Sequence, residues 1–524
     1  MSIIISLFMF RNEVSMKTFM NKILSRRLLL IITLVSAICF SYMVYELQVL
    51  PLKYYIPMIL IVIIMPIVLY FFEANKNNDH TMRVTIVKLI NVLFAVCLVF
   101  VTLNVSKGSD FLSAITKVDD QSIEMNVLVL KNSSDATLTD LKGKKFGANT
   151  SIDAININKT EAKIEDSLGQ IEVAQYSDYS QLITDLENNK INAIIIKATD
   201  LQSLEEIKED INDVVKVIET IKLKIPSVEA NSAEVTQETF NILISGADIE
   251  GDASTFSSAL SDVNMVATIN PKTKQILLTS IPRDYFVDII GMKNVNGKDK
   301  LTHSAKGGIS CTMKTIENLL GIKFNYYARL NFTSFMKVID ALGGITVDVP
   351  KYDVIGRDDG VFTTYIYDYT MKPGVNDFDS KQALAFVRER HAFVEGDVIR
   401  GQNQMLMMKA IIKKCCSASI ITKMDGVFKS LIDCFEINMT SAEIKSLINM
   451  QIDDMASWDV QSYHLTGGGD YRAKTLATVG DVTKANKNGL YVMMPNQNSI
   501  TKAKTYIDIV TEGKEILKVK EDSE

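Results

Sequence analysis

The sequence predicts a membrane-anchored α/β protein, with N-terminal transmembrane helices, a small α/β accessory domain and a larger α/β domain. Two observations predict this class. The mean hydropathy of +0.13 is high for a soluble protein, and the apolar residues concentrate before residue 106. After residue 120, short apolar strands alternate with segments of helical periodicity, which is typical of α/β domains.

Three charge-free apolar runs cover residues 28–45, 54–72 and 89–106. Each is close to the ~20 apolar residues that a helix needs to cross ~30 Å of hydrocarbon. Because no small-residue cleavage site follows the first run, we expect it to remain as an anchor and not to be removed as a signal peptide. Residues 28–106 are therefore predicted to form three transmembrane helices.

The basic residues predict which side of the membrane each segment faces. The first 27 positions hold five Lys and Arg residues, and Lys76 and Arg83 lie between the second and third runs. The loop between the first and second runs has a single basic residue, Lys53. Since short cytoplasmic segments are enriched in Lys and Arg, residues 1–27 are predicted to be cytoplasmic. The domains after residue 106 are then extracellular parts of a multi-pass cell-membrane protein.

Residues 122–224 are predicted to form the accessory domain. Residues 125–130 and 191–196 are apolar strands, and residues 179–188 between them indicate a helix. This order resembles half of a periplasmic solute-binding fold, but the simpler expectation is a domain that spaces or docks the main one. Residues 225–239 contain many small polar residues and are predicted to be a linker.

The larger domain is predicted over residues 240–415, and residues 416–524 are predicted to be its C-terminal helical extension. Turn residues at 270–273 predict that the strands on either side form a hairpin. The predicted strands are residues 240–246, 263–269, 275–281 and 345–349. Helical periodicity marks residues 310–320, 331–342, 381–388, 401–414, 441–450 and 499–511.

Several function classes are excluded or disfavoured by missing signals. The chain has no Walker-type loop, no GxGxxG, no GxSxG and no HExxH sequence. Its four histidines are scattered along the chain, which disfavours a histidine-centred hydrolase. The net charge of −6 gives no support for nucleic-acid binding as the main task.

Acidic and arginine side chains cluster at the ends of the predicted strands. Asp248 follows the first strand, Asp262 opens the second, and Arg283 and Asp284 follow the third. A second group lies in the string FVRERHAFVEGDVIRGQNQ and comprises Arg388, Arg390, Asp397, Arg400, Asn403 and Gln404. Charged residues at the ends of apolar strands can converge on one cleft, although ordinary surface ion pairs are the alternative.

The residue types in these two groups suit a pyrophosphate. Arginine binds phosphate through a planar, bidentate fork of N–H donors. Carboxylates from different strands suit a hard cation such as Mg²⁺, which usually shares its shell with water and phosphate oxygens. The sequence therefore predicts a site for a diphosphate and a divalent cation.

Four long strings strongly resemble the LytR-CpsA-Psr family: NPKTKQILLTSIPRDYFV, DKLTHSAKGGIS, NYYARLNFTSFMKVIDALGGITVDV and QALAFVRERHAFVEGDVIRGQNQ. The three predicted helices and the accessory domain are similar to the capsule-type branch of that family. The resemblance implies an α/β (α-β-α) catalytic domain with a central mixed sheet. It also implies a phosphotransferase that moves a glycopolymer from a polyprenyl-diphosphate carrier onto peptidoglycan at the outer membrane face.

The resemblance also implies roles for individual residues. Asp248 and Asp262 match the acids that hold Mg²⁺ (or Mn²⁺). The catalytic residues that it implies are Arg283, Arg388, Arg390, Asp397, Arg400 and Gln404. Lys300, Asn403 and Asp284 are expected to bind substrate. One departure is Leu260, which stands where many members have arginine, so one phosphate contact is expected to be missing or supplied elsewhere.

The expected partners follow from this function: a polyprenyl-diphosphate-linked glycan donor, a peptidoglycan acceptor, membrane lipid and the machinery that polymerises or exports the polysaccharide. Residues 339–345 and the methionine-rich residues 405–412 are candidate walls for an apolar lipid groove, or simply core. Two alternatives stay open. One is a polyprenyl-diphosphate hydrolase, and the other is a non-catalytic membrane receptor or regulator of polysaccharide synthesis.

Overall fold

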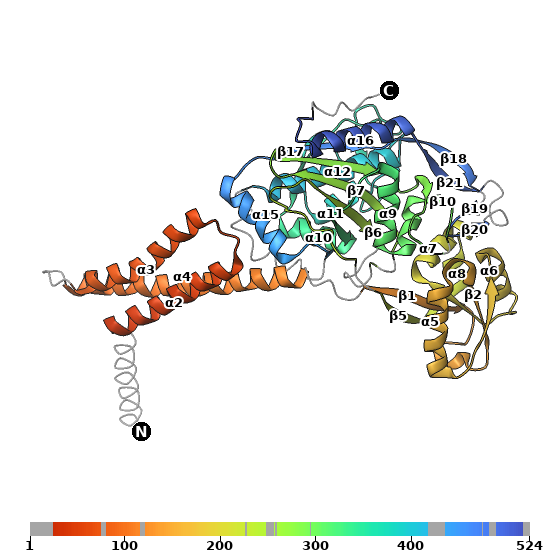
Figure 1. Cartoon of the computed structure of the whole chain (residues 1–524), viewed down its shortest axis with the longest axis horizontal. Coiled ribbons are helices and arrows are strands. Elements are labelled where there is room, and N and C mark those ends of the chain that lie inside the picture. Colours follow the sequence, from red (N-terminus) through yellow and green to blue (C-terminus); the bar gives the residue numbers. More distant parts are fainter. Residues whose placement is uncertain are drawn as a thin grey trace, which may run out of the picture. The chain divides into compact units, whose positions relative to one another are not determined.

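The computed structural model describes residues 25–74, 80–115, 121–225, 228–247, 256, 259–293, 295–417, 435–473, 475–481 and 489–516 (Figure 1). The chain divides into two compact units. One contains the N-terminal helices together with Ser441–Met455, and the other contains Ala114–Thr440 together with Ala456–Glu524.

Within the described residues, the first unit contains three long apolar helices: α2 (Arg26–Leu47), α3 (Leu52–Ala74) and α4 (His80–Ile115). All three are long and apolar enough to cross a membrane, so the prediction of three such helices is confirmed. Many large apolar side chains on them, such as Leu60 and Phe100, stay exposed, as expected of surfaces that lipid covers. The same unit includes α15 (Ser441–Asp454), where Asp453 pairs with Lys53 at 2.9 Å.

The accessory domain is a five-stranded mixed sheet in the order β3-β2-β4-β1-β5. Its strands are β1 (Gln121–Leu130), β2 (Lys145–Asn149), β3 (Glu172–Tyr176), β4 (Ala193–Lys197) and β5 (Val215–Ile225). Helix α5 (Thr150–Leu168) packs on one face of the sheet. Helices α6 (Tyr179–Glu187) and α7 (Ala198–Ile207) pack on the other. The prediction of a small α/β domain is confirmed.

The main sheet has six strands in the order β16-β11-β6-β7-β8-β17. Its strands are β6 (Phe240–Ala247), β7 (Ser261–Asn270), β8 (Gln275–Ile281), β11 (Tyr326–Asn331), β16 (Glu436–Ile437) and β17 (Asp459–His464). Strands β6, β7 and β8 are antiparallel, whereas β11 and β17 run parallel to their neighbours β6 and β8. The sheet is therefore mixed, and the predicted hairpin of β7 and β8 is confirmed.

Successive side chains of β7 point to opposite faces of this sheet. Val266 packs in the core that contains Ile316 of α9 (Ile309–Leu320) and Ile500 of α16 (Gln497–Thr511). Met265 packs instead with Met405 of α12 (Asp397–Cys415). Because successive strand residues face opposite sides, helices cover both faces. The predicted α-β-α architecture is confirmed.

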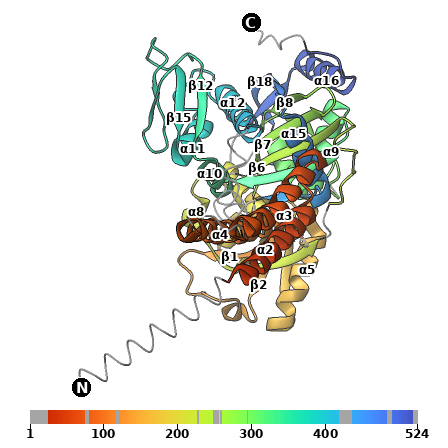
Figure 2. The same cartoon turned by 90° about the vertical axis from the view of Figure 1, so that its left-hand side faces the viewer.

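A smaller cluster of elements stands beside the main sheet and carries part of the site (Figure 2). It contains α10 (Phe332–Ala341), β12 (Ile345–Val349), β15 (Gly374–Phe378) and α11 (Ser380–Arg388), with the short strands β13 (Phe362–Thr363) and β14 (Thr370–Met371). These elements share a core of their own that includes Ile339, Phe378 and Phe386.

The prediction of a helical extension over residues 416–524 is incomplete, because this segment also supplies strands. Strand β17 has few apolar residues, yet it forms one edge of the main sheet, where one flank stays open. The glycines at 467–469 lie in β18 (Gly467–Ala473), which pairs with β21 (Leu490–Pro495). A Cβ on Gly467 would lie 2.5 Å from the Met494 carbonyl oxygen, so close strand packing explains this glycine.

Candidate active site

The open end of the β7–β8 hairpin brings Asp262 next to Arg283. The register pairs Asn264 with Ile281, so two further residues set Asp262 opposite Arg283. The Arg283 Nη1 donates to Asp262 Oδ2 at 2.9 Å. The hydroxyl of Thr302 donates to the other oxygen, Asp262 Oδ1, at 3.3 Å. Asp262 is thus held between two donors, with its side chain still partly exposed.

Arg283 lies close to a second carboxylate as well. Its Nε also lies 3.6 Å from Asp284 Oδ2. Burial opposes the charge on Arg283, but the carboxylates of Asp262 and Asp284 outweigh it and raise the pKa of the guanidinium above its ordinary value. A fixed positive charge therefore stands at the end of β8.

The second group of arginines comes from the end of α11 and the start of α12. Arg388 is the last residue of α11, and its guanidinium carbon lies 3.9 Å from the centre of the Phe332 ring. Asp397, the first residue of α12, forms ion pairs with Arg390 at 3.7 Å and with Arg400 at 3.4 Å. Burial lowers the pKa of Arg400, and Asp397 offsets part of this effect.

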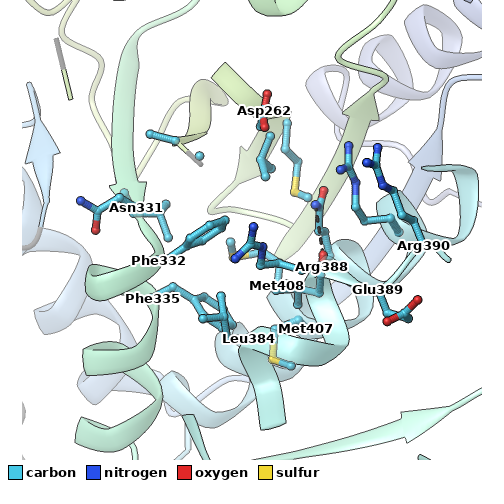
Figure 3. Close-up of a pocket in the computed structure, with 18 of the residues that line it drawn as sticks. Asp262, Asn331, Phe332, Phe335, Leu384, Arg388, Glu389, Arg390, Met407 and Met408 are labelled. Carbon is cyan, nitrogen blue, oxygen red and sulfur yellow. Dashed lines mark hydrogen bonds between the residues drawn. The ribbon is translucent and has the colours of Figure 1, made fainter. Parts of the chain in front are cut away.

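A pocket of about 320 Å³ lies between these two groups (Figure 3). Four arginines line it: Arg283, Arg388, Arg390 and Arg400. Figure 3 shows Phe332 and Phe335 on one side of the pocket and Arg390 on the other, with Asp262 at a third edge. Apolar side chains form much of the remaining wall, including Leu384, Met407, Met408 and Ile411. A concave site with cations at one part and apolar walls at another suits an amphipathic phosphate ester.

A profile of the LytR_cpsA_psr family matches residues 191–507, which is more than half of the chain. The chain belongs to the LytR-CpsA-Psr family. The match extends beyond residues 240–415 on both sides, so the C-terminal strands are part of the family domain. The predicted family is confirmed, and with it the class of phosphotransferase.

Two curated proteins are similar to this chain in sequence. One is the polyisoprenyl-teichoic acid–peptidoglycan teichoic acid transferase TagU from Bacillus licheniformis, 33% identical over 53% of this chain and 78% of the relative. The other is the corresponding transferase TagT from Bacillus subtilis, 34% identical over 44% of this chain and 69% of the relative. Among solved structures, TagV from B. subtilis is 27% identical with a TM-score of 0.41, covering 53% of this chain and 99% of that one.

Most of the predicted site residues meet at the pocket or directly beside it. Asp262, Arg283, Arg388, Arg390, Arg400 and Gln404 line the pocket itself. Asp284 and Asp397 line a smaller adjoining cavity of about 20 Å³, which shares Asp262, Arg283, Arg400 and Gln404 with the pocket. Lys300 lines neither space but lies 3.7 Å from Asp284 and is buried. Asp248 lies outside the described residues.

The structure does not bring Asn403 to the pocket. Its side chain is fully buried, accepts from the hydroxyl of Tyr352 at 2.7 Å and donates to the carbonyl of Phe386 at 3.2 Å. Asn403 therefore ties α12 to α11 and is not placed to bind substrate. Of the candidate groove walls, residues 405–412 contribute Met407, Met408 and Ile411, whereas residues 339–345 contribute nothing to the pocket lining.

The residues that the sequence did not single out are mostly apolar or aromatic. Phe332 and Phe335 come from the start of α10, and Tyr365 comes from the turn between β13 and β14. Glu389 is buried and accepts the backbone N–H groups of Tyr365 and Ala392, so it fastens that turn to the arginine segment. The only signal for Phe332 and Phe335 was their place in the string NFTSF at a helix start.

His464 is another residue that the sequence did not single out. It is the last residue of β17 and lines the smaller cavity with Asp397. Burial lowers the pKa of His464 to about 4, although the nearby Asp397 carboxylate acts in the opposite direction. The ring is thus neutral at neutral pH.

The donor set at the pocket suits a cation that is held mainly by its substrate. Among the described residues, no group of three or more His, Cys, Asp or Glu side chains converges as a closed metal cage. Mg²⁺ usually keeps several waters and takes one or two protein carboxylates together with phosphate oxygens. Asp262 offers one such carboxylate at the edge of the pocket. Among the described residues, this one carboxylate is available to such a cation, and the cation itself stays a prediction.

Proposed function

We propose that this protein transfers a glycopolymer, such as a capsular polysaccharide, from a polyprenyl diphosphate to peptidoglycan. The observation that carries the proposal is a single pocket in which four arginines meet a wall of Phe, Leu and Met side chains. Cations and apolar side chains in one pocket complement a lipid diphosphate, whose charge lies at the end of a hydrocarbon tail. The teichoic acid transferase activity in the names of its relatives is of the same class.

In this proposal the arginines hold the diphosphate and neutralise its charge. Arg388 ends α11 and Arg390 follows it by two residues, whereas Arg283 and Arg400 are held by Asp262 and Asp397 respectively. Phosphoryl transfer depends on positioning and charge stabilisation more than on covalent chemistry by the protein. Arginines already fixed by carboxylates need little reorganisation as charge develops on the leaving phosphate.

The transfer step itself breaks the bond between the sugar-linked phosphorus and the bridging oxygen. An acceptor hydroxyl forms the new bond to that phosphorus, and polyprenyl monophosphate leaves with the bridging oxygen. Asp284 and Asp397, the carboxylates of the adjoining cavity, are the candidates to take the hydroxyl proton. Asp262 together with Asp248 would hold Mg²⁺ (or Mn²⁺), which supplies further charge neutralisation at phosphate oxygens.

The apolar part of the pocket is assigned to the first isoprene units of the donor. Phe332 packs against Arg388, so the phosphate-binding cation and the apolar wall adjoin each other. We assign the domains after residue 106 to the outer side of the membrane, because Lys and Arg concentrate before and between the predicted helices. Anchoring in the bilayer that holds the donor raises its local concentration without further affinity.

The test uses the full-length protein in detergent with a polyprenyl-diphosphate glycan, a peptidoglycan acceptor and Mg²⁺. We expect release of polyprenyl monophosphate that depends on the acceptor, and loss of release in Arg388→Ala. Arg357→Ala is the matched control, because Arg357 is exposed and pairs only with Asp359 among the described residues. Release without acceptor would instead support a hydrolase, and donor binding without any release would support a receptor or regulator.

A further inference from the structure

A second cavity, of about 160 Å³, lies where the accessory domain meets the catalytic domain. Its accessory-domain wall comes from the start of α5 and from the junction of β4 with α7. Its catalytic-domain wall comes from residues 291–293 and 306–307. Of the described residues that line it, none also lines the arginine pocket.

The topology of the accessory sheet places this cavity where open α/β sheets bind ligands. Strands β2 and β4 are neighbours and parallel, with Phe146 opposite Ala193. The chain leaves β2 into α5 on one face of the sheet and leaves β4 into α7 on the other. Connections that diverge in this way open a crevice beyond the carboxyl ends of the two strands. Lys197, the last residue of β4, lines the cavity at this point.

Two buried lysines reach the cavity, and one of them is fully balanced by its neighbours. Lys306 Nζ lies 3.1 Å from Asp200 Oδ1. The hydroxyl of Tyr179 donates to Asp200 Oδ2 at 2.7 Å. All three side chains are buried. The charge of Lys306 therefore already has a close carboxylate partner, which leaves Lys306 little capacity for a further anion.

Lys197 differs from Lys306 in its surroundings. Its side chain is only 7% exposed, and it donates to the backbone carbonyl of Lys306. The carboxylate it contacts, Asp153, lies 3.9 Å away, beyond hydrogen-bonding distance. Both oxygens of Asp153 accept from Asn156 Nδ2, at 3.0 and 2.8 Å. An ammonium has three donors, and a buried charge is costly without a close partner, so Lys197 can take an anion.

The rest of the cavity wall indicates what kind of anion fits. Ile123, Ile152, Ile155 and Met292 are apolar, and Lys293 is a third lysine of the lining, at an exposed position. A cavity volume of about 160 Å³ limits the ligand to a small molecule. We propose that this cavity binds a small organic carboxylate, with its anionic group on Lys197 and its apolar body against the isoleucine and methionine side chains.

One short element joins this cavity to the catalytic site. The 3-10 helix η3 (Leu301–Gly307) ends with Lys306 and Gly307 at the cavity. Near its start, Thr302 donates to Asp262 and its backbone N–H donates to the carbonyl of Arg283. A ligand in the cavity therefore contacts an element that also positions the Asp262–Arg283 pair. An effect of this ligand on glycopolymer transfer rests on the proposed function, whereas the binding of the ligand to the cavity does not.

The binding test uses isothermal titration calorimetry on the full-length protein in detergent, with 3-methylbutanoate as the probe and 3-methylbutanamide as its uncharged counterpart. We expect saturable binding of the acid with half-saturation at roughly 1 mM, since small probes bind weakly, and binding of the amide at least about 10-fold weaker. Lys197→Met removes acid binding. Lys208→Met retains it, because Lys208 lies outside the cavity and pairs with Glu187 and Asp210.

A second variant keeps the test decisive if Lys197→Met does not fold. Ala154→Phe fills the cavity from its partly exposed wall and leaves both lysines in place, so it should also remove acid binding while thermal unfolding stays cooperative. The proposal is wrong if the wild type shows no saturable acid binding up to about 20 mM, or if acid and amide bind alike. Equal acid affinity in wild type and Lys197→Met also contradicts it, and the charges then serve only to dock the domains. Because the assay contains no donor or acceptor, its failure leaves the transferase proposal intact.

Discussion

Gly401 of α12 lies directly against the ring of His464 at the end of β17. A Cβ on Gly401 would lie 2.5 Å from His464 Cε1, closer than real side chains approach. The glycine in the string IRGQNQ therefore serves helix–sheet packing. This contact fixes the first turns of α12, which carry Asp397, Arg400 and Gln404.

We expect Gly401→Ala to push α12 away from β17 and to displace Arg400 from the pocket. Overpacking of this kind costs about 1–3 kcal/mol in the free energy of unfolding. Turnover should fall by about 10-fold or more, because small displacements of positioned groups are costly to catalysis. Thermal unfolding and acceptor-dependent release of polyprenyl monophosphate check both effects. Gly356→Ala serves as a control, because a Cβ there meets no atom of the described residues within 4 Å, although its positive φ of 73° makes some strain unavoidable.

His464 predicts a pH dependence of stability. Burial lowers its folded-state pKa to about 4, whereas an unfolded histidine has a pKa of about 6.5. Between these values the unfolded chain binds the extra proton, so stability is fully present above pH ~6.5 and falls as the pH drops towards 4. Because the ring is partly accessible, we expect a loss of about 1–3 kcal/mol. Urea unfolding across this pH range should show a weaker dependence in His464→Gln, and an unchanged slope would exclude His464 as the cause.

Asn403→Ala tests whether the Asn403 side chain stabilises the fold or binds substrate. Its buried amide links Tyr352 to the carbonyl of Phe386, so Asn403→Ala leaves both groups without this partner. We expect a loss of about 1–3 kcal/mol in the free energy of unfolding. At a temperature where the variant is folded, KM for the donor should stay within about 2-fold of wild type. A large rise in KM with unchanged stability would instead return Asn403 to the substrate site.

The parts of the site that could be predicted from the sequence lie in continuous strings. Arg283 follows directly after an apolar strand, and Arg388, Arg390 and Arg400 share one short segment. Their convergence depends on a hairpin register and on the turn between α11 and α12, both of which local patterns indicate. The family resemblance added roles that residue types alone leave open.

The apolar wall and the interdomain cavity could not be predicted in the same way. Phe332, Leu384 and Met408 come from three separate helices, and any apolar helical residue looks like core until the packing is known. Strand β17 was missed because the residues DVQSYH lack the apolar alternation of a half-buried strand. Its place at a sheet edge relaxes that requirement.

Asp262→Asn tests whether the carboxylate or only its shape positions Arg283. The amide keeps one oxygen that can accept from Arg283 but loses the charge, so we expect turnover to fall by roughly 10–100-fold. The fall should persist at saturating donor, because the arginine is needed as charge develops in the transition state. Asp359→Asn is the control, since Asp359 pairs with Arg357 on an exposed surface. If Asp262→Asn raises only the Mg²⁺ concentration needed for half-maximal activity, the carboxylate acts on the cation and not on Arg283.

Phe332→Ala tests the junction between the apolar wall and the phosphate-binding cations. The ring packs against the Arg388 guanidinium at 3.9 Å and forms part of the pocket wall. Its removal loses both a cation–π contact of about 0.5–2 kcal/mol and apolar contact with the donor. We therefore expect KM for a long-chain donor to rise by about 10-fold or more, and less for a donor with a short water-soluble tail. Phe332→Leu keeps the apolar contact but not the π face, so it should restore the preference for the long tail while Arg388 remains less firmly held. Equal losses for both donors in Phe332→Ala would place the lipid tail elsewhere and limit Phe332 to holding Arg388.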